Sequence, residues 1–367
     1  MSHKFITVHT VTALPLHNMN RDQSGLPKSQ FDGGIQRGRI SAQALKRAAR
    51  VAFLNDVPEA SVRTRDGVGV ALKHAVEYAA TKGLDFDEKA GRAAIKKVVD
   101  GLAKAAKDKD DDAKAEDSDA QGDNILFFAT SELQTLAVAA VEAQADGATL
   151  SSTDCIQDAR SASLDVAAFG RMFAAAHDLG THAAVAVSHS ATTHPFALTA
   201  DYFSAVDDAQ DGHAGAGHIG MTYYTSGTYY RTFTIDVEQL RRSWSRFGAE
   251  GSRNELSSLV RALITALPSG RVSNSNPHTL PALVLVEQQR SRCAYDFDEP
   301  IEADGRGYKA PTLAALAAKR RSALRFDPSN FGRAVVAGEV GDLDFAAEQV
   351  ETLDDIVATV ADAVYGA

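Results

Sequence analysis

The spacing of apolar residues changes twice along this chain, and this limits the fold class more than any other feature. Residues 63–145 carry apolar side chains at helical spacing. Short β-branched runs flank this region, at residues 5–12 and in three segments after Gly180. Two further helical stretches are expected at residues 256–266 and 313–323. Because strands and helices occupy separate parts of the chain, the sequence predicts an α+β fold.

The composition is that of an ordinary globular protein. Of 367 residues, 44% are hydrophobic and 23% charged, enough to bury one large core or a core with attached subdomains. The two cysteines, Cys155 and Cys293, form no metal-ligand motif and no disulfide framework, so a reducing compartment, the cytoplasm, is expected. The apolar stretches are too short or too broken to cross a bilayer, so no membrane association is predicted.

Charge is distributed unevenly along the chain. The formal net charge is −10, but residues 1–50 hold eight Lys or Arg against two Asp or Glu, a local excess of +6. Residues 108–123 are polar and acidic without apolar periodicity, which predicts a solvated or disordered loop that holds no site. A basic N-terminal segment in an acidic protein is a candidate binding surface for a polyanion.

The basic segment contains a predicted helix. Ser41 is a suitable N-cap, and Leu45 and Ala49 belong to the apolar stripe that follows. Arg37 and Arg39 precede the helix, whose amides at its start would also favour a phosphate. The spacing indicates either a phosphate-binding surface or an ordinary solvated face. Its polar stripe consists of Gln43, Lys46, Arg47 and Arg50.

Seven short motifs between residues 20 and 231 add a more specific signal. They are NRD (20–22), GG...R.RIS.Q.LKRA (33–48), SVRT (61–64), LDVAAFGRM (164–172), SHSATTH (188–194), DYFSAVDD (201–208) and SGTYYR (226–231). In this order they resemble the motifs of the CasC family, the backbone subunit of the type I-E CRISPR Cascade complex in the Cas-seven superfamily. Several separated motifs in register are far more specific than any one of them.

The resemblance implies a fold with three parts. It implies a ferredoxin-like palm related to RNA-recognition motifs, a helical finger subdomain and a projecting thumb loop. The palm would comprise residues 1–60, 181–200 and 223–367. The fingers would comprise residues 61–180, including the acidic insert, and the thumb residues 201–222.

The resemblance also implies partners and a role. Copies of such a subunit stack along a CRISPR guide RNA, together with other Cascade subunits, and present the guide for pairing with target DNA. This role is not enzymatic and requires no cofactor. The subunit would bind the phosphates of the guide RNA, so that its bases stay free to pair with the target.

The resemblance also implies which residues of this chain bind RNA, at the positions that match the family's motifs. In the family the basic helix holds the guide's phosphates, which here implies Ser41, Gln43, Lys46 and Arg50, with Asn20, Arg21 and Lys28 from the preceding loop. Met172 and Phe203 occupy the apolar positions beside a displaced base, where an apolar side chain can stack without reading base identity. Without the resemblance, both residues would be assigned to the core.

A metal-dependent ribonuclease on the same fold is the alternative. Five histidines between His182 and His218 are close enough in sequence to suggest a metal site, but their spacing matches no ligand motif. Structural or RNA-contacting histidines are therefore favoured, and no metal is expected. Asp32 is the other candidate, because related backbone subunits of type III complexes cut RNA with an aspartate in a comparable loop. Walker A, Rossmann and GxSxG patterns are absent.

Overall fold

The computed structural model describes residues 3–58, 60–103, 125–206 and 216–366. The acidic segment 108–123 lies outside these described residues. Within them, no helix combines the length and the apolar character needed to cross a membrane. The fold is a mixed α+β fold, as the sequence predicts, and contains a large mixed sheet.

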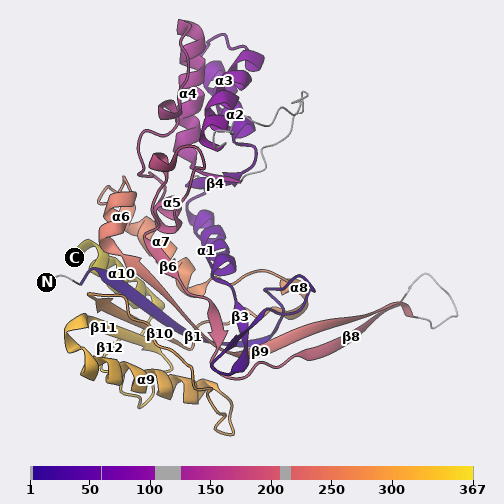
Figure 1. Ribbon diagram of the computed structural model, residues 1–367, viewed down its shortest axis with the longest axis vertical. Coiled ribbons are helices and arrows are strands. Elements are labelled where there is room, and N and C mark those ends of the chain that lie inside the picture. The colour runs from indigo at the N-terminus through magenta and orange to yellow at the C-terminus, as the bar shows by residue number, and fades with distance from the viewer. Residues whose placement is uncertain (1–2, 59, 104–124, 207–215, 367) are drawn as a thin grey trace, which may run out of the picture. The chain divides into compact units, whose positions relative to one another are not determined.

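The strands and helices alternate irregularly along the chain (Figure 1). The strands are β1 (Phe5–His17), β2 (Ser29–Asp32), β3 (Ile35–Ile40), β4 (Ser61–Thr64), β5 (Leu126–Ala129), β6 (Val185–Val187), β7 (Ser190–Thr192), β8 (Thr199–Val206), β9 (Ala216–Asp236), β10 (Leu283–Gln289), β11 (Phe331–Gly338) and β12 (Glu348–Gln349). The α-helices are α1 (Ala42–Asp56), α2 (Gly67–Lys82), α3 (Glu88–Ala103), α4 (Thr130–Asp146), α5 (Leu164–Phe169), α6 (Val237–Ser243), α7 (Ser252–Thr265), α8 (Val272–Ser275), α9 (Lys309–Phe326) and α10 (Leu353–Gly366).

The chain forms two compact units. Unit 1 comprises Met1–Ala52, Ala186–Ile235 and Ser257–Ala367, and unit 2 comprises Phe53–Val185 and Asp236–Leu256. The segment Asp236–Leu256 therefore belongs to unit 2, although the sequence interpretation assigned it to the palm. The palm, finger and thumb assignments remain predictions.

The main sheet gives unit 1 its core. Its strand order is β12-β11-β10-β1-β9-β7-β3-β2, and β6 and β8 also pair with β9. Strands β1 and β10 are antiparallel, with Val11 opposite Leu283. Both side chains belong to a buried cluster with Leu313 and Leu316 of α9, because side chains on paired residues share a face. Figure 1 shows α9 and α10 on opposite faces of β1, β10 and β11.

Strands β8 and β9 form a long antiparallel hairpin. The pairing runs from Thr199 opposite Tyr224 to Val206 opposite Ala216. Figure 1 shows this two-stranded arm extending away from the rest of the unit 1 sheet. The sequence predicted a projecting hairpin or loop in this segment.

Residues 182–190 (HAAVAVSHS), the first of the three strand segments predicted after Gly180, do not form one strand. The segment contains β6 and the first residue of β7, separated by Ser188 and His189. At the break, the Ser188 N–H donates to the Thr232 carbonyl at 2.9 Å, and the Thr232 N–H donates to Ser188 Oγ at 2.8 Å. A side-chain oxygen thus replaces a carbonyl in the ladder, which interrupts the strand.

Unit 2 is mainly helical. Helices α2, α3 and α4 bury a cluster that includes Ala75, Ile95, Leu102 and Leu136. The helical spacing over residues 63–145 predicted this part correctly. It did not predict the two-stranded sheet of β4 and β5, which are only four residues long each.

Candidate nucleic-acid interface

Helix α1 begins where the sequence predicted. Ser41 Oγ accepts a hydrogen bond from the Ala44 N–H at 3.3 Å, which is the bond of an N-cap residue. Leu45 and Ala49 are buried. The Ser41 N–H donates to Asn20 Oδ1 at 2.8 Å, so the loop before β2 is tied to the helix start. Ser41 and Asn20 therefore hold the loop before β2 against the helix start.

The polar stripe of α1 lies where the helical spacing places it. Gln43 and Arg47 are exposed, whereas Lys46 and Arg50 are half-buried. Burial lowers the pKa of the Lys46 ammonium group from its ordinary value. A half-buried cation is partly dehydrated, so a phosphate that reaches it displaces less water than at a fully exposed lysine.

Two further cations lie near the start of the helix, Lys28 directly before β2 and Arg39 on β3. The Lys28 carbonyl accepts from the Arg39 N–H at 2.8 Å, and the Lys28 N–H donates to the Asn20 carbonyl at 2.9 Å. Both side chains are half-buried. Arg21 is exposed, in a turn that Asp22 closes by accepting from the Ser24 and Leu26 N–H groups. Loop, strand and helix thus bring separate basic residues to one edge of unit 1.

Arg37 has a different task from the RNA contact that the sequence suggested. Its side chain is 1% exposed. The guanidinium donates to the carbonyls of Asp32, Thr192, Phe297 and Asp298. With four hydrogen bonds inside the protein, Arg37 is a structural residue that joins the β2–β3 hairpin to the loop after β10.

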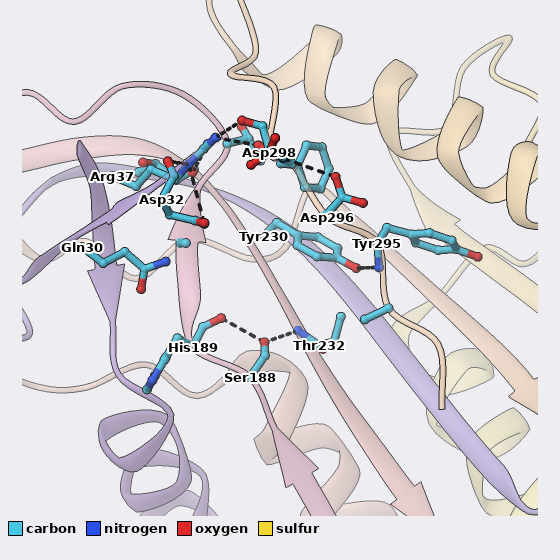
Figure 2. Close-up of a pocket in the computed structure, with 15 residues that line it drawn as sticks. Gln30, Asp32, Arg37, Ser188, His189, Tyr230, Thr232, Tyr295, Asp296 and Asp298 are labelled. Carbon is cyan, nitrogen blue, oxygen red and sulfur yellow. Dashed lines mark hydrogen bonds and ion pairs between the residues drawn. The ribbon is translucent and has the colours of Figure 1, made fainter. Parts of the chain in front are cut away.

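A cavity of about 290 Å³ lies next to this hairpin (Figure 2). Asp32, Asp296 and Asp298 contribute carboxylates to its lining, and Tyr230 and Tyr295 contribute aromatic rings. Asp296 Oδ1 pairs with Lys319 Nζ at 3.2 Å, and Asp32 Oδ2 is 3.9 Å from Arg37 Nε. The other lining residues are Gln30, Arg37, Ser188, His189, Ala191, Thr192, Thr193, Thr232, Ala294 and Phe297.

His189 also contacts the helix start, although no spacing in the sequence indicates this contact. Its Nδ1 accepts a hydrogen bond from the Ala42 N–H at 2.8 Å. Burial lowers the pKa of His189, and the charges of Arg39 and Lys28 lower it further. The imidazole therefore lies within the field of both cations. The contact joins residues 147 positions apart, so spacing alone could not reveal it.

The two apolar site residues are not core residues. Met172 is 76% exposed and belongs to unit 2, shortly after α5. Phe203 is 43% exposed on β8 of unit 1. Its ring lies over Gly220 across the hairpin, where an added Cβ would be only 2.3 Å from the ring. Gly220 thus leaves room for the ring of Phe203.

The described residues show no group of three His, Cys, Asp or Glu side chains that could hold a metal ion. His194 is buried, and its Nε2 accepts from the Thr228 N–H at 3.0 Å while its ring stacks on Tyr308. His182 is exposed and belongs to unit 2, whereas His213 lies outside the described residues.

Comparisons with known proteins agree on the fold. A solved structure from a "CRISPR RNA-guided surveillance complex, pre-nicking" is 24% identical, with a TM-score of 0.80, over 98% of this chain and 100% of that chain. Another, from a "CRISPR RNA-guided surveillance complex", is 21% identical, with a TM-score of 0.73, over 98% and 99% of the two chains. No curated protein sequence matched the chain. Residues 6–360 match the family described as CT1975-like protein, and since this match spans nearly the whole chain, the chain belongs to that family.

Proposed function

We propose that this protein is a backbone subunit of a type I CRISPR surveillance complex, of the CasC kind found in type I-E Cascade. Several copies bind one guide RNA and hold it for pairing with target DNA, without catalysing a reaction. The family match and the names of the two similar complexes support this assignment. The motifs that resemble CasC support the subtype.

The observation that carries the proposal is the basic edge around the start of α1. Lys28, directly before β2, and Arg39, on β3, are joined by a backbone hydrogen bond, and Asn20 ties this region to the helix start. Lys46 and Arg50 follow one turn apart on the helix. In an acidic chain, such a concentration of cations fits the phosphates of a nucleic acid. Contacts to phosphates carry no sequence information, as a subunit that holds many different guides requires.

Co-expression with a CRISPR array tests this function. We expect the purified protein to carry RNA, visible as a raised ratio of absorbance at 260 nm to that at 280 nm. Sequencing should identify the bound RNA as processed array transcript. Protein that purifies free of RNA and also fails to bind a synthetic guide would contradict the proposal.

A metal-dependent ribonuclease is the second candidate, because the exposed Asp32 carboxylate lines a cavity beside the basic edge. Incubation with labelled RNA and Mg²⁺ or Mn²⁺ separates the two functions. We expect no cleavage. Cleavage that disappears in Asp32→Asn would establish the ribonuclease instead.

A further inference from the structure

His189 is held rigidly in the break between β6 and β7. Ser188 is bonded to Thr232 through both its N–H and its hydroxyl, and the same hydroxyl donates to the His189 carbonyl at 2.9 Å. Figure 2 shows Ser188 between these two partners. In the side chain of His189, Nδ1 accepts a hydrogen bond from the Ala42 N–H. The backbone and the ring of His189 are therefore both positioned by the fold.

The bond from Ala42 determines which ring nitrogen carries the proton. A nitrogen that accepts a hydrogen bond has no proton of its own, so the neutral ring must be protonated on Nε2. A doubly protonated ring would place two N–H groups against each other at Nδ1. Burial and the charges of Arg39 and Lys28 also lower the pKa of His189. The ring is thus a neutral donor rather than another cation.

The Nε2–H donor is available to a ligand. His189 is exposed, and Nε2 has no hydrogen-bond partner among the described residues. Ligands drawn to Arg39 and Lys28 are anionic and carry oxygen acceptors. An uncharged donor next to two cations fits a nucleic-acid backbone, which offers phosphate oxygens and, in RNA, 2′-hydroxyl groups.

We infer that His189 is a further RNA-contacting residue, whose Nε2–H donates to a backbone oxygen of the strand held by Lys28 and Arg39. This inference rests on the proposed RNA-binding function. The acceptor is a phosphate oxygen or a ribose 2′-hydroxyl.

Two substitutions separate the outward donor from the bond to the helix. In His189→Asn, the side-chain oxygen can accept from the Ala42 N–H as Nδ1 does, but the short amide cannot present a donor where Nε2 was. In His189→Gln, the longer amide can present that donor but its oxygen does not match Nδ1. We expect Asn to preserve the unfolding midpoint and weaken RNA binding by roughly 2- to 12-fold, the range for one neutral hydrogen bond.

The expected orders of the two measured properties are therefore opposite. RNA affinity should fall from wild type through Gln to Asn, whereas thermal stability should be unchanged in Asn and lowered in Gln. His278→Asn, at an exposed histidine of the same unit, should change neither property. The inference is overturned if RNA affinity follows stability across the two variants, or if both variants bind RNA as wild type does.

A strand of the same sequence with 2′-deoxyribose identifies the acceptor. If the acceptor is a 2′-hydroxyl, His189→Asn should lose nothing on the deoxy strand. If it is a phosphate, the loss should be the same on both strands. The double variant Lys46→Ala with Arg50→Ala is measured in the same experiment. If this double variant binds RNA weakly while His189→Asn binds it normally, the role of His189 is overturned but the proposed function is not. If the wild-type protein binds no RNA, the proposed function itself is overturned.

Discussion

At the scale of single residues, the cations of α1 can be tested through their dependence on salt. Each phosphate neutralised on a single strand contributes about −0.7 to the slope of log K against log salt concentration. Lys46→Ala with Arg50→Ala should therefore flatten the slope by roughly 1.4 per subunit. Because the proposed contacts are to phosphates, the loss should be equal on two unrelated guide sequences. Fluorescence anisotropy over a salt series measures both quantities.

A matched double variant separates a local contact from a general change in charge. Arg306→Ala with Arg325→Ala removes two exposed positive charges from the same unit, away from α1 in sequence. It should leave the salt slope near the wild-type value. An equal change of slope in both double variants would show that net charge matters rather than the surface of α1.

Arg37 and Arg39 lie two residues apart on β3, but their substitutions should affect different properties: protein stability for Arg37 and RNA binding for Arg39. Arg37→Met fills a similar volume and leaves four carbonyls without their donor, which should cost about 2–4 kcal/mol of unfolding free energy. Arg39→Met removes a half-buried cation whose Nε has no hydrogen-bond partner, so it should mainly weaken RNA binding. Urea unfolding and RNA titration on both variants test this. A stable Arg37→Met protein would contradict the structural role.

At the scale of elements, the β8–β9 hairpin and the segment after α5 present apolar side chains to solvent. Phe203→Ala with Met172→Ala should fold normally because both side chains are substantially exposed. It should still bind guide RNA, but its target strand should hybridise more slowly, since stacking contributes about 1–3 kcal/mol per base. The control is Phe326→Ala with Leu280→Ala, two exposed apolar residues elsewhere. Wild-type hybridisation rates in the first double variant would rule out the stacking role.

Local pattern predicted those elements whose causes are local. Ser41 and the spacing of Leu45 and Ala49 indicated α1 correctly, because an N-cap and an apolar stripe depend on neighbouring residues. Arg37 was misjudged because its acceptors include the carbonyls of residues about 260 positions away. The bond between His189 and Ala42 was missed for the same reason. Contacts made only by tertiary structure leave no periodic signal in the sequence.

At the scale of the whole molecule, unit 1 contains a buried ionic cluster that links its stability to pH. Glu287 accepts from Arg320 Nε at 2.7 Å, from the Tyr295 hydroxyl at 3.0 Å, and lies 2.9 Å from His9 Nε2. Burial alone would raise the pKa of Glu287, but the bond and charge of His9, the charge of Arg320 and the bond from Tyr295 together lower it. A carboxyl group whose pKa is lower in the folded protein than in the unfolded chain stabilises the folded state at neutral pH.

This stabilisation should be lost only in acid. It is fully present above the pKa of an unfolded glutamate, about 4.3, and disappears as the pH falls through the lower pKa of the folded state. Glu287→Gln should cost about 3–5 kcal/mol at pH 7 because Arg320 is left buried without its counter-ion, and the difference from wild type should shrink below pH 4. Glu348→Gln, in the exposed pair with Arg333, should cost less than about 1 kcal/mol. A pH-independent difference would contradict the ionic origin.

The proposed assembly along RNA would depend on how charge is distributed over the whole chain. Residues 1–50 carry +6, so the rest of the chain, with 30 basic and 46 acidic residues, carries −16. With a net charge of −10 each, two copies without RNA should repel each other at low salt, whereas an RNA strand should attract the basic edge of each copy.

The number of bound copies should accordingly follow the length of the RNA rather than the protein concentration alone. Native mass spectrometry on guides of increasing length should show masses that rise in steps of one subunit, and the protein without RNA should remain a single copy at low salt. Lys46→Ala with Arg50→Ala should reduce the number of copies on each guide, because the attraction is weakened while the repulsion between copies remains. One bound copy at every RNA length would mean that the basic edge binds RNA but does not build a filament.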